Sequence, residues 1–411
     1  MIRSSRTYNV VFIVLSLAGV MSAPALAKPT DRLYELKCGR CHAAHDPTEY
    51  AAEEWVGLVN SMKSQAALTV AEMEELVAYL ESESREGQSE EGSGPMLGGY
   101  LYTEYFRTSE KAKNFDIHYL AVSISGWASE QISYFGEFEL EHGGKGDNTF
   151  VEQAYIDYWL TRNVAVKIGG LLTPFNRFDE FHDPLGNALI TRPQMAREIG
   201  VSAWKDVGVD LHGFARLNEE TAVNFDLYAI NGLGAGVNLR GSRQYRDNNE
   251  QLAFGGRLNV VYRDFLEVGG SAYRGAWDDA GDLDLTMLGG HFMLRTGVAN
   301  VYGEWAQATS ENAADAEEGE MSGYFVQASR LIQSRYRPAI RWGGLDYLDR
   351  GDLLGRNAGK GDKELTELAF AFSYYPTSPV VFKVEYTFFK EGDRVAEKDD
   401  DQLGLQAAVR F

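Results

Sequence analysis

Two cysteines and a histidine stand together near the start of the chain, in the run Cys38-Gly39-Arg40-Cys41-His42. They are the two cysteines of the sequence, and their spacing is the C-x-x-C-H pattern of covalent c-type haem attachment. Thiols three positions apart can reach the two vinyl groups on one porphyrin edge, and the adjacent imidazole can then bind the iron. The run predicts one haem c.

The cysteine pair has two other interpretations. Paired cysteines in an oxidising compartment can form a redox-active disulfide. They can also form half of a zinc site, which would need two further ligands. Haem attachment is favoured because the pair is not preceded by a thioredoxin-like strand pattern and the sequence has no second cysteine pair.

The first 27 residues have the pattern of an export signal. Arg3 and Arg6 precede an apolar stretch over residues 10–21, and Ala25-Leu26-Ala27 offers small residues for cleavage. The apolar run is shorter than the roughly 20 residues of a transmembrane helix. We therefore expect export from the cytoplasm, which agrees with haem attachment outside it.

The residues around the haem motif predict a small helical domain over residues 28–81. A short helix is expected over 31–37 and an amphipathic helix over 70–80, with Met73 on its apolar face. The segment resembles small class I cytochromes c in Trp55, Val59, Met62, Tyr79 and Leu80. That resemblance implies His42 as the proximal iron ligand and Met62 as the distal ligand. Met73 and His45 are lesser candidates for the sixth position, and Met62 could instead fill core.

A polar stretch, SESREGQSEEGSGP, follows the predicted domain and has no apolar side chain to bury, so residues 82–96 are expected to be a flexible linker. Residues 28–95 hold fourteen acidic and six basic side chains. This excess would favour a basic redox partner, or could serve solubility alone. The whole chain has a net charge of -21, which argues against a nucleic-acid partner.

Residues 97–411 change to aromatic-rich, partly alternating segments separated by polar turns, the pattern of a transmembrane β-barrel. In the last segment, Leu405 and Phe411 fall on one face and Gln406 and Arg410 on the other. Sixteen strands are predicted, near 98–107, 116–127, 130–142, 149–160, 163–171, 204–216, 221–231, 250–261, 265–275, 283–295, 298–308, 318–331, 335–347, 363–375, 379–390 and 400–411.

The breaks after even-numbered segments are short and those after odd-numbered segments are mostly long, as in bacterial outer-membrane barrels. A soluble β-protein, the other interpretation, gives no reason for such parity. Both chain ends of the barrel then lie on the short-turn side. The predicted fold is therefore a small helical cytochrome c domain followed by an outer-membrane barrel, with the haem domain periplasmic or within the lumen.

Charged side chains are expected along the barrel wall and in its loops. Glu137, Glu139 and Glu141 would line one side of the lumen and Arg335, Arg337 and Arg341 another, as solvated pore lining. Acid-rich loops could concentrate divalent cations, or be ordinary solvated charge: Asp278, Asp279, Asp282 and Asp284; Glu311, Asp315, Glu317, Glu318 and Glu320; Asp399, Asp400 and Asp401. His182, near Asp179, Glu180 and Asp183, is a further candidate iron site.

Residues 152–159 and 168–175 resemble porins of the phosphate-selective O/P type. The chain as a whole resembles fused cytochrome–porin proteins of the outer membrane, whose best-known members are iron oxidases. The resemblance implies electron transfer from extracellular Fe(II) to a periplasmic electron-transfer protein, an Fe(II):cytochrome c oxidoreductase activity. In the iron-oxidising group an Ala-x-Pro-x-Phe-Ala-Arg pattern precedes the haem motif. Residues 27–32 of this chain lack the Phe-Ala-Arg portion of that pattern, which leaves the identity of the electron donor open. The alternatives are a porin for small solutes with a cytochrome appendage, and a barrel that anchors a cytochrome.

Overall fold

The structure is a computed structural model, and it describes a number of single positions and ranges of the chain. They are positions 33, 34, 37, 47, 52, 55, 59 and 68, and then 70–86, 95–108, 114–129, 131–144, 149–161, 163–181, 183–218, 220–236, 238–263, 265–312, 318–333, 335–346, 353–355, 364–377, 379–393, 396, 398 and 400–411. Residues 1–27, Cys38, Cys41, His42, His45 and Met62 lie outside these ranges.

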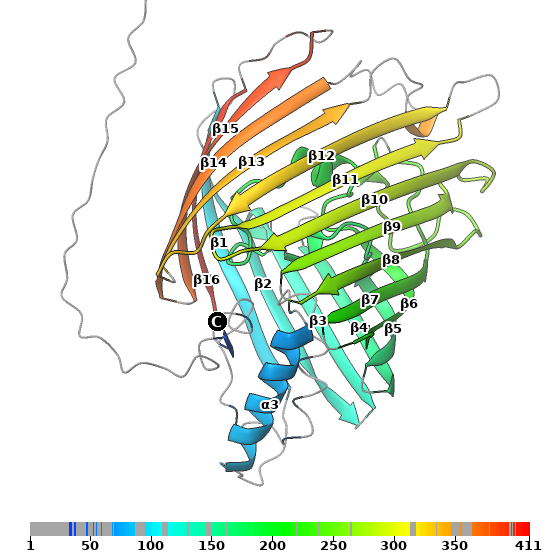
Figure 1. The fold of residues 1–411 in the computed structure, drawn as a ribbon. Helices are drawn as coiled ribbons and strands as arrows, with labels where there is room; N and C mark the ends of the chain where they lie inside the picture. Colours follow the sequence, from blue (N-terminus) through cyan, green and yellow to red (C-terminus); the bar gives the residue numbers. More distant parts are fainter. Residues whose placement is uncertain are drawn as a thin grey trace, which may run out of the picture.

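Sixteen antiparallel strands close into a barrel in which β1 pairs with both β2 and β16 (Figure 1). The strands are β1 (Met96–Thr108), β2 (Asn114–Ser129), β3 (Ile132–Glu141), β4 (Thr149–Thr161), β5 (Val164–Leu172), β6 (Lys205–Arg216), β7 (Thr221–Ile230), β8 (Ala253–Tyr262), β9 (Leu266–Ala276), β10 (Asp284–Arg295), β11 (Asn300–Ser310), β12 (Gly319–Ser329), β13 (Tyr336–Asp346), β14 (Glu364–Thr377), β15 (Val380–Glu391) and β16 (Gln402–Arg410). Each predicted strand lies within three residues of an observed one, so the barrel prediction is confirmed.

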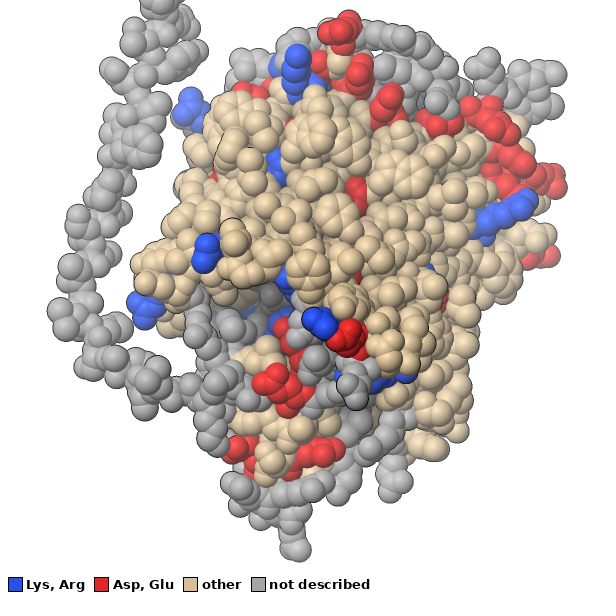
Figure 2. Space-filling view, viewed as in Figure 1, with Lys and Arg blue, Asp and Glu red and all other residues tan. Residues whose placement is uncertain are grey.

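The two faces of each strand differ in chemistry. On β16, Leu405 points outward and is exposed, whereas Gln406 and Arg410 point inward and are buried. Large apolar side chains are exposed around the outer wall, among them Ile156, Phe254, Trp305, Trp342, Phe382 and Phe388. Figure 2 shows this wall as a broad uncharged surface, with acidic side chains gathered near its ends. A wall of this kind suits contact with lipid hydrocarbon.

The two ends of the barrel are built from different connections. The connections after β2, β4 and the other even-numbered strands take two to six residues, and those after odd-numbered strands take five to thirty-two. We call these the short-turn end and the long-loop end. The barrel begins and ends at the short-turn end, and the parity predicted from the sequence is confirmed.

Helix α3 (Val70–Glu86) precedes the barrel and buries one face, with Met73, Leu76 and Leu80 on it. It continues six residues beyond the predicted end, because Glu and Arg favour helix. The first part of the predicted linker, residues 82–86, is therefore helical, and residues 87–94 lie outside the described ranges.

Short helices complete the described elements: η3 (His142–Gly144), η4 (Phe178–Phe181), α4 (Gln194–Glu198), η5 (Arg240–Ser242) and η6 (Leu353–Gly355). No helix within the described ranges is long and apolar enough to cross a membrane.

Candidate functional site

The residue before the cysteine motif is tied to α3. The Lys37 ammonium lies 2.8 Å from a carboxylate oxygen of Glu72, in the first turn of the helix. Both side chains are largely covered, at 14% and 18% exposure, so this ion pair is better shielded from solvent than an ordinary surface pair. The predicted haem ligands, Cys38, Cys41, His42 and Met62, lie outside the described residues, and their roles remain predictions.

An apolar cluster links the segment around the motif to α3. The ring of Tyr34 meets the ring of Trp55 edge-on at 6.2 Å, and the indole nitrogen of Trp55 donates a hydrogen bond to the Pro47 carbonyl at 2.9 Å. Both rings are buried together with Leu76 and Met73. Met73 therefore packs in the core of the segment.

The same cluster continues into the barrel. Phe214 at the end of β6 and Ala222 at the start of β7 are buried in it, and Trp127 near the end of β2 packs against it. All three point to the inside of the barrel at its short-turn end. Figure 1 shows α3 beside this end. We call the described residues between 33 and 86 the cytochrome-like segment. We call Trp127, Phe214 and Ala222 the seat, because this segment packs on them.

The packing of the segment on the seat can be tested by weakening it. Leu76, on α3, is fully buried in the cluster that joins the segment to the barrel, and Leu76→Ala should cost about 2–5 kcal/mol because it leaves a cavity. We expect the segment to leave the seat more often and to be cleaved faster by trypsin. Ala78→Ser, on the exposed face of the same helix, is the control. Equal cleavage rates for both variants would contradict the seat.

Beyond the seat, aromatic and polar side chains line the mouth at the short-turn end. The rings of Trp127 and Trp159 are 6.3 Å apart, and Trp159 meets His212 edge-on at 6.1 Å. The Trp159 indole donates to the Ser133 hydroxyl at 3.0 Å, and His212 pairs with Asp157 at 2.9 Å. These contacts fix the inner rim on which the segment rests.

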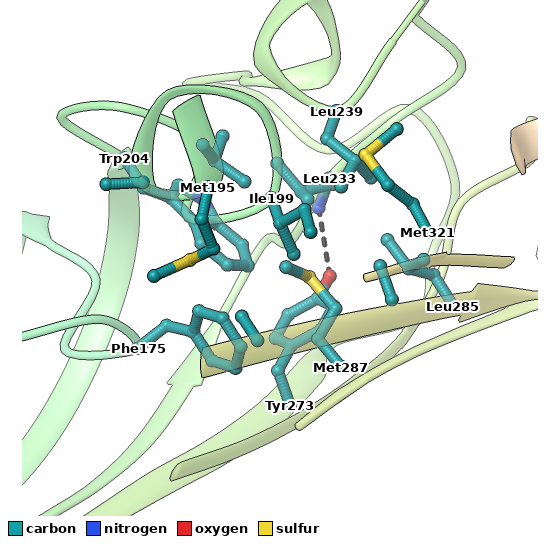
Figure 3. Close-up of a cluster of buried hydrophobic side chains, with 14 of the residues drawn as sticks. Phe175, Met195, Ile199, Trp204, Leu233, Leu239, Tyr273, Leu285, Met287 and Met321 are labelled. Carbon is teal, nitrogen blue, oxygen red and sulfur yellow. Dashed lines mark hydrogen bonds between the residues drawn. The ribbon is translucent and has the colours of Figure 1, made fainter. Parts of the chain in front are cut away.

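The long connection from β5 to β6, residues 173–204, crosses the lumen; we call it the crossing loop. Its apolar residues Phe175, Met195, Ile199 and Trp204 pack against the inner wall on the far strands (Figure 3). Trp204 meets Tyr273 of β9 at 4.9 Å, and the Tyr273 hydroxyl accepts a hydrogen bond from the Leu233 amide at 3.0 Å. Much of the lumen is therefore a packed apolar core.

Charged side chains on the opposite wall bind the backbone of the crossing loop. Arg341 donates to the carbonyl and hydroxyl oxygens of Thr191 at 2.7 and 2.6 Å. Glu385 accepts from the amides of Ile190 and Thr191 at 2.5 and 3.2 Å. The Lys383 ammonium donates to the carbonyl of residue Asn187 at 2.9 Å. The loop is thus fastened to β13 and β15, far from its own strands.

These anchors correct the expectation of solvated pore lining. Arg341 has no exposed surface, and Glu139 is 2% exposed while accepting from the Tyr100 hydroxyl and pairing with Lys205. Arg337 also binds the loop, through the carbonyl of Gly186. The predicted orientation into the lumen is right for these residues, but their role is to hold protein. Arg335 lies outside β13, in the exposed turn before it.

The acid-rich loops are explained largely by their own contacts. Asp278 accepts from the amides of Asp282 and Leu283, and Asp284 pairs with Arg274. Asp179 and Asp183 likewise accept from nearby groups of the crossing loop. Across the described ranges, no group of three or more His, Cys, Asp or Glu side chains is arranged to hold a metal ion. His182, Asp315, Glu317 and Asp399 lie outside those ranges.

Residues 34–118 match a family model described as dihaem cytochrome c. The match begins at Tyr34 in the segment, includes α3 and reaches His118 in β2. It supports a haem c in this chain. The description names two haems, whereas the chain has cysteines for one C-x-x-C-H site.

Two curated proteins resemble parts of the chain. An uncharacterized protein of Aquifex aeolicus is 26% identical over 196 residues, which is 44% of each chain. The cytochrome c-type protein TorY of Haemophilus influenzae is 34% identical over 56 residues, 14% of this chain and 15% of that protein. The chain spans less than half the length of these relatives.

Solved structures with similar folds include proteins and channels of bacterial outer membranes. The anion-selective porin from Comamonas acidovorans superposes with a TM-score of 0.57, and outer-membrane expressed OmpT of Vibrio cholerae with 0.55, each at 12% identity over 78% of this chain and 99% of theirs. The channel DcaP of Acinetobacter baumannii gives 0.56 at 12% identity, over 79% and 99%. At this identity the likeness shows the fold alone. The chain combines a cytochrome c-like segment with a porin-like barrel.

Proposed function

We propose that the protein carries electrons at the bacterial outer membrane, with one haem c held by Cys38, Cys41 and His42 and with Met62 as the distal ligand. The observation that carries this proposal is the seat, which joins the cytochrome-like segment to the inside of the barrel mouth. A freely tethered appendage would have no such contact. The partner on the inner side would be a periplasmic electron-transfer protein.

The residues around the motif fit a haem. Two thiols and an imidazole are the donor set of c-type attachment. The adjoining cluster of Tyr34, Trp55 and Leu76 is apolar and buried, the surroundings in which a porphyrin is shielded from water. When bound, the haem supplies a one-electron redox couple. The chain itself orients that site, through the Lys37–Glu72 ion pair and the packing of α3 on the seat.

The topology of the barrel indicates on which side of the membrane the haem domain would lie. Outer-membrane barrels place short turns on the periplasmic side and long loops outside, around an apolar band about 25 Å tall. The seat lies at the short-turn end, so the haem domain would stand at the periplasmic mouth. An electron donor must then reach the lumen from the long-loop end.

Extracellular Fe(II) is the donor that we propose to test first, on the resemblance to cytochrome–porin iron oxidases. The other candidate function is a porin for small solutes that carries a cytochrome. The porin-like fold favours it, whereas the packed crossing loop and the occupied mouth argue against an open path for solutes.

Stopped-flow visible spectroscopy tests the donor. Purified full-length protein is mixed with Fe(II), or with organic reductants as a comparison, and the haem band is followed. Fast reduction by Fe(II) is the expected result. Reduction by the organic compounds with no response to Fe(II) would remove iron as the donor and leave electron transfer standing, while a protein without haem absorption would end the proposal.

The distal ligand has its own test. Met62→Ala should remove the sulfur-to-iron absorption of the oxidised haem and lower its reduction potential, because Met ligation raises the potential relative to ligation by nitrogen or water. Met73→Ala is the matched control, since Met73 lies on α3 and is buried. An unchanged spectrum in Met62→Ala, with a changed one in Met73→Ala, would reverse the assignment.

A further inference from the structure

A β-bulge interrupts the pairing of β1 with β2 in the half of the barrel nearer the long-loop end. Tyr102 pairs with Tyr119 and Thr103 with Ile117, so His118 is an extra residue on β2. The imidazole of His118 stacks on Tyr102 at 5.3 Å and on Tyr119 at 4.7 Å. A bulge of this kind re-aims a side chain, and bulges are frequent at barrel rims and beside functional sites.

Two carboxylates face each other beside the bulge. Glu104 and Asp116 occupy directly opposite positions on β1 and β2, an arrangement that is destabilising for like charges. Each carboxylate contacts an imidazole. The Nδ1 atom of His118 lies 2.6 Å from Glu104, and the Nδ1 atom of His142, in η3, lies 2.5 Å from Asp116. The two imidazole rings are 5.1 Å apart.

A carboxylate beside Nδ1 selects between the two tautomers of a neutral imidazole. When Nδ1–H donates to a carboxylate, the neutral ring presents the lone pair of Nε2. Neither Nε2 atom, of His118 or of His142, has a hydrogen bond to the described part of the chain. Glu104 is itself held by an amide hydrogen bond from Gln406 at 2.7 Å. The side chains of His118 and His142 are 30% and 47% exposed, so an ion from solution can reach them.

We propose that His118 and His142 bind a divalent first-row transition-metal ion through their Nε2 atoms, at the long-loop end of the barrel. A carboxylate on the other ring nitrogen is the arrangement that orients metal-binding histidines in proteins. With metal–nitrogen bonds of about 2.1 Å, two imidazoles in adjacent coordination positions have ring centres about 5 Å apart, close to the observed spacing.

The proposed site has two protein ligands, and water completes the coordination. It is therefore consistent with the lack of any three-ligand group among the described residues. Imidazole ligands favour Fe(II), Co(II), Ni(II), Cu(II) and Zn(II) over Ca(II) and Mg(II), which prefer oxygen. The nearby carboxylates of Glu104 and Asp116 balance the charge of the ion. The site lies at the opposite end of the barrel from the seat, and it does not depend on the haem.

Copper(II) is the probe, because its electron paramagnetic resonance spectrum resolves coupling to each bound nitrogen. Purified full-length protein is titrated with Cu(II) below one equivalent. We expect a spectrum with two nitrogen couplings, one coupling in His118→Ala and in His142→Ala, and no displacement by excess Ca(II). Asp116→Ala should keep both couplings and weaken binding about 10- to 100-fold, since Asp116 only orients a ligand.

His291→Gln is the control, because His291 also pairs with a carboxylate, Glu267, but is buried in the wall. Its spectrum should equal that of the unaltered protein. His142 is half exposed, so His142→Ala should not disturb the barrel. Two nitrogen couplings that persist in both His→Ala variants, or displacement of Cu(II) by Ca(II), would overturn the site. The readout is independent of haem reduction, so this result and the electron-transfer result can fail separately.

Discussion

Replacing Cys38 and Cys41 by alanine is expected to remove all covalently bound haem while leaving the barrel folded. The sequence has no other cysteine that could form a thioether bond. The sixteen strands begin at Met96, so neither cysteine belongs to them. The pyridine haemochrome spectrum should vanish, and with it every haem-dependent reduction. The altered mobility of a folded barrel on unheated gels should persist.

Two further variants make this prediction specific. Cys41→Ala alone should leave haem held by one thioether, with a shifted haemochrome band, because one vinyl group stays unreacted. Arg40→Lys, between the two cysteines, keeps both thiols and the histidine and should keep the normal band. Covalent haem in the double variant would show that Cys38 and Cys41 do not attach it.

The strands could be predicted because their signal is local. Alternation of apolar and polar residues is a property of ten adjacent positions, and in β16 it separates Leu405 from Gln406 without reference to the rest of the molecule. The parity of the connections is also visible in the sequence. The strand order of the barrel then follows, because each strand pairs with its neighbours in the chain.

The role of the lumen charges could not be predicted, because it depends on distant parts of the chain. Arg341 binds Thr191 across 150 residues of sequence, and Glu385 binds the same residue across 194. The alternation of β13 indicates that Arg341 points inward, but it does not indicate that the crossing loop lies against Arg341. The inward direction was therefore predicted correctly, and solvation was predicted wrongly.

The seat and the bulge were missed for related reasons. Phe214 and Trp127 are aromatic residues at strand ends, which in barrels are also common at membrane interfaces. Alternation places both on the inner face, but it cannot indicate that α3 is what they contact there. The bulge shifts the face of one residue, His118, and alternation in β2 alone does not reveal it. The Asp-x-His pattern at the start of the strand, Asp116-Ile117-His118, was the signal that could have pointed to it.

Opening the lumen is the second large effect that we expect. Glu385→Ala removes the acceptor for the amides of Ile190 and Thr191 and for the Thr191 hydroxyl. Each amide left buried without a partner costs about 1–3 kcal/mol. The crossing loop should then leave the wall for part of the time, and ionic current through single proteins in a planar bilayer should rise several-fold from a low value. Glu220→Gln is the control, because Glu220 lies in an exposed turn. A hydrogen bond from Arg263 lowers the pKa of the Glu220 carboxyl, so this variant also loses one negative charge.

Combining Glu385→Ala with Leu76→Ala separates the two obstructions in the lumen. The first change loosens the crossing loop, and the second loosens α3 on the seat at the other mouth. If both obstruct the path, the double variant should conduct more than the sum of the two single increases, because ions must pass the obstructions in series. A large current in the unaltered protein, unaffected by either change, would contradict a closed conduit and support the solute pore. One electrical measurement therefore decides between a closed lumen and an open solute pore.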